Sequence, residues 1–236
     1  MDLAIMQPYF FPYLGYFSLI KHSDLFVLLD DVQFIRHGWI DRNRILKPET
    51  GWQYIHCPLH KHSRQTPIKD LQIRSEDNWK SKILAQLIHY KKKAPFYNDT
   101  ISLLECIFKE EINDLSTFNQ KSLIFICEYI GFSYRIKKFK ELNISIDSPL
   151  EPDEWALNIC NSFGGVKKYI NPIGGRAFFD KKKYEKSNIE LCFQNFKITD
   201  YTQKRNDFEP GLSIIDVLMF NSPNDIDIML NNYDLI

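Results

Sequence analysis

The side chains best suited to catalysis lie between residues 30 and 44. Asp30 and Asp31 are adjacent carboxylates at the end of an apolar run, and His37 follows them as a side chain that titrates near neutral pH. Such groups can take a proton from an amine or bind it. Strand alternation directs the two aspartates to opposite faces, so we expect one to face a site. The alternative is that both accept hydrogen bonds from backbone amides in a turn.

Arg42 and Arg44 flank Asn43, and they share one face if this piece is extended. A guanidinium group binds two phosphate oxygens at once, which suits the diphosphate of a nucleotide sugar. A salt bridge with Asp31 or Asp41 is an equally good interpretation of both arginines.

Other polar and aromatic residues would orient a ligand rather than react with it. Gln33 and Asn43 are amides close to the aspartates, and Gln203 is a third amide from the C-terminal part that could complete the site. Trp39 would either stack on a sugar or base or fill the core.

A metal site and a thiol nucleophile are disfavoured. His56, His60 and His62 lie close in sequence, but Pro58 prevents a helix that would align them, so we expect a polar loop. Cys57 lies in an alternating run, which favours a buried structural thiol over an acyl-carrying one. No metal or prosthetic group is indicated, and the cofactor is left open.

Composition narrows the class of protein. The chain has 236 residues, 44% of them hydrophobic, and its 30 basic residues balance its 30 acidic ones, so no overall field attracts DNA or a lipid surface. The five cysteines lack any C-x-x-C pair, which is typical of reduced thiols. No secretion signal or membrane-spanning run is recognisable at this stage, and we expect a soluble, cytoplasmic protein.

The elements that must position these residues alternate between strands and helices. Short apolar runs predict buried strands, and apolar residues at helical spacing predict helices. Gly131 is a natural helix end, and Ser213 with Asp216 resembles a capping box. The expected strands are 2–7, 25–30, 52–58 as an extension of the sheet, 68–73, 133–136, 168–171 and 189–196; the expected helices are one entered near Gly15, one from Asn78 capped by Ser75, 97–109, 116–130, 154–161 and 213–220.

This rhythm predicts an α/β fold with a mostly parallel sheet, flanking helices and a helical or irregular C-terminal part. We expect one domain over 1–236, with a possible subdivision into an α/β core at 1–140 and a C-terminal part at 141–236. Polar groups that follow parallel strands meet at one edge of the sheet, where open α/β sheets build a ligand crevice.

Ordered motifs along the chain resemble the WbqC-like protein family. They are Gln-Pro-Tyr-Phe-Phe-Pro-Tyr-Leu-Gly-Tyr-Phe at 7–17, Asp-Asp-Val-Gln-Phe at 30–34, Arg-Asn-Arg-Ile at 42–45, the tyrosine, lysines and Ala-Pro-Phe-Tyr of 90–97, Gly174-Gly175 with Phe179-Asp180, Tyr201-Thr202-Gln203, Phe208-Glu209-Pro210, and 212–218. Met6 stands where many members carry histidine, so we expect no histidine base there.

The family resemblance implies a role in bacterial surface-polysaccharide (O-antigen, lipopolysaccharide) biosynthesis. Members have been proposed to transfer glycine or another aminoacyl group to an amino sugar. The function implied is therefore an acyl- or aminoacyl-transferase acting on a nucleotide-linked or lipid-linked amino sugar, with an acyl donor that is either free or carrier-bound. Gln7, Tyr9 and the residues above would form its substrate site.

The start of the chain is also similar in layout to pantothenate synthetase and related nucleotidyl-transferring enzymes. There a strand leads into a His-x-Gly-His turn at a helix start; here Tyr13-Leu14-Gly15-Tyr16 matches it, with tyrosines in place of both histidines. Gly15 would let a ligand approach the backbone, and Tyr13 and Tyr16 would donate hydrogen bonds. Two alternatives to the transferase therefore stay open: a nucleotide-dependent ligase or nucleotidyltransferase, and a non-catalytic binding partner of polysaccharide assembly.

Overall fold

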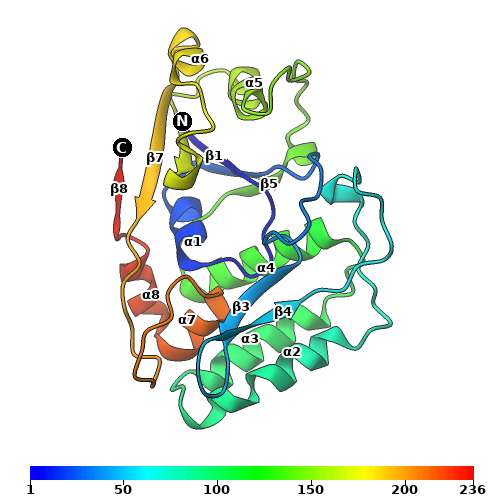
Figure 1. Ribbon diagram of the computed structural model, residues 1–236. Coiled ribbons are helices and arrows are strands. Elements are labelled where there is room, and N and C mark those ends of the chain that lie inside the picture. Colours follow the sequence, from blue (N-terminus) through cyan, green and yellow to red (C-terminus); the bar gives the residue numbers. More distant parts are fainter.

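A short apolar run, Leu3-Ala4-Ile5, forms a central strand of a six-stranded sheet. The computed structural model describes residues 1–236 (Figure 1). The sheet has the order β5-β2-β1-β6-β7-β8, in which β8 alone is antiparallel to its neighbour. The strands are β1 (Asp2–Met6), β2 (Leu25–Leu28), β5 (Ile136–Lys138), β6 (Lys168–Pro172), β7 (Glu190–Phe196) and β8 (Tyr233–Leu235).

Helices cover both faces of this sheet, which confirms the predicted α/β class with a mostly parallel sheet. Alternation along β1 sends Ala4 into the larger core and Leu3 and Ile5 into the smaller one. Figure 1 shows α5 and α6 on one side of the sheet and α4, α7 and α8 on the other. The helices are α1 (Leu14–Lys21), α2 (Trp79–Leu87), α3 (Tyr97–Lys109), α4 (Leu115–Ile130), α5 (Glu154–Phe163), α6 (Lys181–Lys186), α7 (Ile214–Phe220) and α8 (Pro223–Met229), with short 3-10 turns at Ile68–Asp70, Ile88–Lys92, Phe139–Leu142 and Ile173–Gly175.

The order of the strands reverses between β1 and β6. From β1 the chain proceeds to β2 and β5 on one side, and later to β6 and β7 on the other. Loops that leave the carboxyl ends of β1 and β6 therefore diverge, which opens a crevice at this edge of an open α/β sheet.

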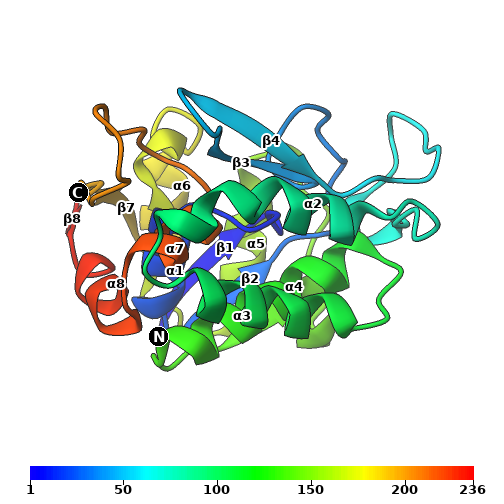
Figure 2. The same cartoon turned by 90° about the horizontal axis from the view of Figure 1, so that it is seen from below.

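The expectation that residues 52–58 extend this sheet is wrong. β4 (Trp52–His56) pairs antiparallel with β3 (Arg42–Leu46) in a separate two-stranded ribbon. The intervening turn ends in Gly51, whose positive φ of 68° suits a tight hairpin. Figure 2 shows the ribbon apart from the main sheet, with α2 lying near it.

Local signals at several element ends can be checked. Gly131 has a φ of 93° and ends α4, as predicted. The proposed cap at Ser75 is wrong, because α2 starts after Asn78 without a side-chain cap. Ser213 does cap α7, but Asp216 does not complete a capping box, since its carboxylate points into a buried cluster described below. Residues 68–73 begin as a 3-10 turn rather than as a strand.

Candidate functional site

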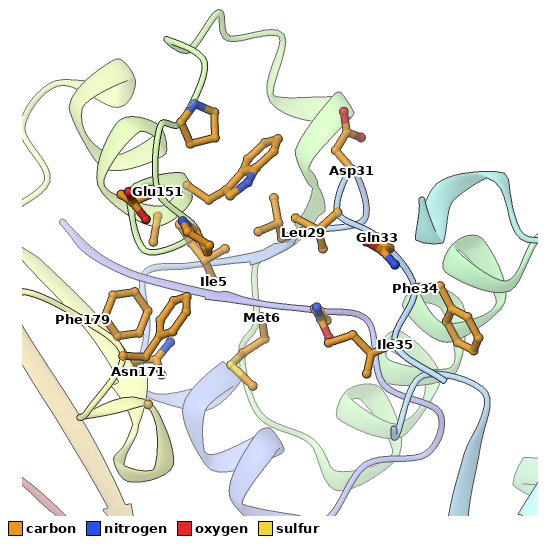
Figure 3. Close-up of a pocket in the computed structure, with 18 of the residues that line it drawn as sticks. Ile5, Met6, Leu29, Asp31, Gln33, Phe34, Ile35, Glu151, Asn171 and Phe179 are labelled. Atoms are coloured by element: carbon orange, nitrogen blue, oxygen red, sulfur yellow. The ribbon is translucent and has the colours of Figure 1, made fainter. Parts of the chain in front are cut away.

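A cavity of about 1170 Å³ lies at the point where the strand order reverses. Residues that end or follow β1, β2 and β6 line it, and a loop before α5 lies across from them. Figure 3 shows Asp31 and Gln33 on one side and Glu151 and Phe179 on the other, with Met6 between them. This position is the one that the parallel-sheet topology favours for a ligand.

Four of the predicted site residues line this cavity: Gln7, Tyr9, Asp31 and Gln33. Gln7 and Tyr9 follow β1, and burial raises the pKa of the Tyr9 phenol, so it stays protonated as a donor. The Gln7 carbonyl accepts a hydrogen bond of 2.8 Å from the Tyr16 hydroxyl, which fixes the turn after β1 from below.

Asp31 is the aspartate that faces the cavity. Its Oδ2 forms a 2.9 Å ion pair with Lys69 Nζ, and its Oδ1 has no hydrogen-bond partner in the protein. The hydrogen bond to Asp31 is the main reason that the pKa of Lys69 is raised. One carboxylate oxygen is thus anchored, while the other is buried and lacks a hydrogen-bond donor.

Asp30 lies beneath the cavity rather than in it. Its side chain is fully buried, and its Oδ2 accepts a hydrogen bond of 2.5 Å from Ser116 on α4. Burial raises the pKa of Asp30, while the Ser116 hydrogen bond and the nearby Lys138 charge oppose that rise. The backbone carbonyl of Asp30 also accepts from the Lys69 amide at 2.9 Å. Asp30 therefore holds the loop that carries Asp31.

Arg42 contacts the loop after β2 and does not line the cavity. Its guanidinium donates to the carbonyls of His37 (2.5 Å) and Gly38 (3.3 Å) and lies 4.2 Å from the centre of the Tyr54 ring. His37 is exposed, has a φ of 64°, and also lies outside the cavity. Neither arginine forms the alternative salt bridge, since Asp31 pairs with Lys69 and Asp41 with His56.

Arg44 also points away from the cavity. It lies between the rings of Trp39 (5.3 Å) and Trp52 (5.0 Å) and donates to the Gly211 carbonyl at 3.2 Å. Between the two arginines, Asn43 is buried and donates to the carbonyls of Phe10 and Phe11. The ribbon thus holds the 10–12 turn in place. The β3 side chains that were predicted to bind a ligand instead contact other parts of the protein.

The tetrad at the start of α1 makes internal contacts. A Cβ atom on Gly15 would lie 2.5 Å from the Tyr13 ring. The glycine therefore makes room for the Tyr13 side chain rather than for a ligand. Tyr16 is buried and its hydroxyl serves the Gln7 carbonyl. None of Tyr13, Gly15 and Tyr16 lines the cavity.

Gln203 belongs to a separate buried cluster around Asp216. The Asp216 carboxylate accepts hydrogen bonds from Tyr90 (2.6 Å), Tyr201 (2.6 Å) and Gln203 (3.1 Å), and the Tyr90 hydroxyl accepts one from the Leu46 amide. Burial raises the pKa of Asp216 to about 6, although the three donors oppose the rise. This cluster joins the ribbon to α7 at a distance from the cavity.

The clustered histidines have separate partners. His56 contacts Asp41 at 3.1 Å, His60 lies 3.9 Å from Glu76, and His62 bonds the His60 carbonyl. The chain contains no group of three or more His, Cys, Asp or Glu side chains placed to hold a metal ion. Cys57 is buried, and burial raises the pKa of its thiol.

Sequence reasoning missed the far side of the cavity. Glu151 lies in the loop before α5, and Trp155 lies in the first turn of that helix. Asn171 lies at the end of β6, and Phe178 and Phe179 follow that strand. Only the motif that contains Phe179 pointed to this region. Sequence reasoning also missed Arg36 and Arg64, which line the cavity beside Gln33, because neither arginine lies in a motif.

The comparisons with known proteins agree with the motifs. The model of the WbqC-like protein family matches residues 7–228, a span that includes every cavity residue named above except Met6. The chain belongs to the WbqC-like protein family.

One relative of this WbqC-like chain matches it over nearly its full length. It is 29% identical over 221 residues to "Uncharacterized protein Rv1507c" of Mycobacterium tuberculosis, and the match covers 93% of each chain. No solved structure matches the chain. None of the helices is both long and apolar enough to cross a lipid bilayer.

Proposed function

We propose that this protein is an acyl- or aminoacyl-transferase that modifies a nucleotide-linked or lipid-linked amino sugar. The observation that carries the proposal is the cavity at the strand reversal, where the half-anchored carboxylate of Asp31 lies among aromatic side chains. Aromatic faces such as those of Trp155 and Phe178 stack on sugars and bases. The family resemblance supports the same reaction class.

Asp31 is the group that prepares the acceptor amine in this proposal. A rotation of the Asp31 side chain exposes its unpaired Oδ1, which accepts a hydrogen bond from the sugar ammonium and takes its proton. The neutral amine then attacks the carbonyl carbon of the donor, a C–N bond forms, and the bond from that carbon to the donor's oxygen or sulfur breaks. The nitrogen loses its second proton to the leaving group, and Asp31 releases the first proton to solvent and returns to its ionised form. The donor is an activated ester or thioester of the acyl group.

Thermal stabilisation by a ligand panel tests the proposal first. The panel contains ATP, coenzyme A, and uridine- and thymidine-diphosphate amino sugars. A ligand at about 100 times its dissociation constant stabilises the folded state by roughly 2.7 kcal/mol. In a chain of this size the melting temperature then rises on the order of 5–10 °C. We expect this response with an amino-sugar nucleotide, whereas a response to ATP alone would favour the ligase or nucleotidyltransferase.

Substitution of Asp31 tests the proposed chemistry. We expect Asp31→Asn to abolish formation of the amide product, followed by mass spectrometry with the sugar that stabilises the protein and a set of activated acyl donors. Asp207→Asn is the matched control, because Asp207 is exposed and lies outside the cavity. Full product formation by Asp31→Asn would contradict the role given to Asp31.

A further inference from the structure

Two arginines on one side of the cavity have no partner in the protein. Arg36 and Arg64 both line the cavity and both are exposed. No carboxylate lies within ion-pair distance of either guanidinium, and neither donates a hydrogen bond to another residue. By contrast, Arg42, Arg44 and Arg205 each donate to backbone carbonyls.

The two arginines are held on hydrogen-bonded neighbouring segments. Gln33 Nε2 donates to the Arg64 carbonyl at 2.7 Å, and the Phe34 amide donates to the Thr66 carbonyl at 3.0 Å. Gln33 also forms an isolated bridge with Pro67. These contacts fix the backbone from which both side chains extend, so the guanidinium groups share one side of the cavity without contacting an acid.

Arg42 stabilises the turn that follows Arg36. Its two bonds to the carbonyls of His37 and Gly38 fix a turn in which His37 adopts a positive φ of 64°. A non-glycine residue in this conformation needs support from its surroundings. Arg42 therefore acts as a positioning residue for Arg36.

Charge is distributed unevenly around the cavity. Lys69 neutralises Asp31, and Glu151 lies on the side opposite Gln33 and Ile35 (Figure 3). Two unpaired positive charges thus lie on the Gln33 side, and an unpaired negative charge lies across from them. A ligand that matches this pattern is anionic at one end and cationic at the other, as an amino sugar on a diphosphate is.

We infer that Arg36 and Arg64 bind the diphosphate of the sugar substrate. This inference rests on the proposed function, because it assigns an end of the same cavity. Two planar guanidinium forks can each bind a pair of phosphate oxygens, and the geometry is specific to arginine. The sugar then extends from the diphosphate into the cavity, where its amino group reaches Asp31 on the same side as Gln33. A nucleoside diphosphate and an isoprenoid diphosphate share this chemistry.

Isothermal titration calorimetry with three probes tests the inference: pyrophosphate, uridine diphosphate and geranyl diphosphate. We expect the wild-type protein to bind pyrophosphate and at least one of the two esters. The Arg36→Ala and Arg64→Ala variants should each weaken binding about tenfold or more, and the double variant about a hundredfold. Tighter binding of one ester over the other identifies the nucleoside or the lipid as the carrier.

Matched variants separate this role from general effects of charge. Arg135→Ala is the control, because Arg135 is also exposed, precedes β5 at the amino ends of the parallel strands, and does not line the cavity. The Arg36→Lys and Arg64→Lys double variant keeps the charge and should recover only part of the affinity. The absence of wild-type binding to every probe, or equal binding by wild type and the double alanine variant, would overturn the inference. Binding that depends on both arginines without any acyl transfer would leave this inference standing and refute the proposed reaction.

Discussion

Replacement of Asp216 by asparagine should make the stability of this protein less dependent on pH. The Asp216 side chain is fully buried, and two tyrosines and Gln203 donate hydrogen bonds to it. Burial raises its pKa from 3.8 to about 6, so the folded protein binds the proton more tightly than the unfolded chain does. Protonation of Asp216 therefore stabilises the fold, and this stabilisation is lost as the pH rises through about 6.

The expected magnitude follows from the size of the shift. A change of about two pKa units corresponds to roughly 3 kcal/mol between the fully protonated and the fully ionised limits. Between pH 7 and pH 5 about 1.3 kcal/mol of it should appear, since most of the proton uptake by the folded state takes place in this interval. For a chain of this size that is a rise in melting temperature of about 3–5 °C.

Thermal unfolding of wild type and Asp216→Asn at pH 7 and pH 5 measures the effect. The comparison is between the two pH-dependent changes, because Asp30, whose pKa is also raised, contributes equally to both proteins. We expect the wild type to gain about 3–5 °C more than the variant when the pH falls from 7 to 5. Equal changes in two folded proteins would refute the argument that Asp216 titrates in this interval.

Two further substitutions test packing. Asn43→Ala removes both hydrogen bonds to the carbonyls of Phe10 and Phe11, and we expect a loss of about 3 kcal/mol in urea unfolding. The exposed Asn206→Ala is the control and should change the stability little. A loss below about 1 kcal/mol would contradict the role of Asn43. Phe118→Ala opens a space among four aromatic rings, with an expected loss of about 3–5 kcal/mol in the same assay; a nearly neutral effect, as expected for exposed Phe178→Ala, would count against it.

The fold was largely predictable because its signals are local. The helix expected at 97–109 has those bounds, and Gly131 ends α4 in the left-handed conformation that its lack of a Cβ permits. The error at Trp52–His56 concerns pairing. Alternation indicates a strand, but the choice between the sheet edge and β3 depends on where the chain returns after Leu46, and no local pattern records that.

The candidate site was predictable only on the side that follows β1 and β2. Gln7 follows β1 directly, and Asp31 and Gln33 lie in the loop that follows β2, so topology brings them to one edge. Arg42 and Arg44 do share a face, but that face meets aromatic rings and backbone carbonyls. The far side of the cavity comes into place only when β6 pairs with β1, a long-range contact that sequence patterns did not predict. The roles of all these residues stay predictions.

The place of β1 between β2 and β6 sets a constraint on how the chain is made. One edge of β1 pairs with residues 25–28, which are made soon after it, but the other edge pairs with Lys168, Tyr169 and Ile170, which are made much later. During the interval between them, the nascent protein carries an open strand edge, the kind of surface that recruits other chains. A chain truncated near residue 140 would therefore keep this edge open and be prone to aggregate, and the nascent chain is expected to need a chaperone until β6 is made.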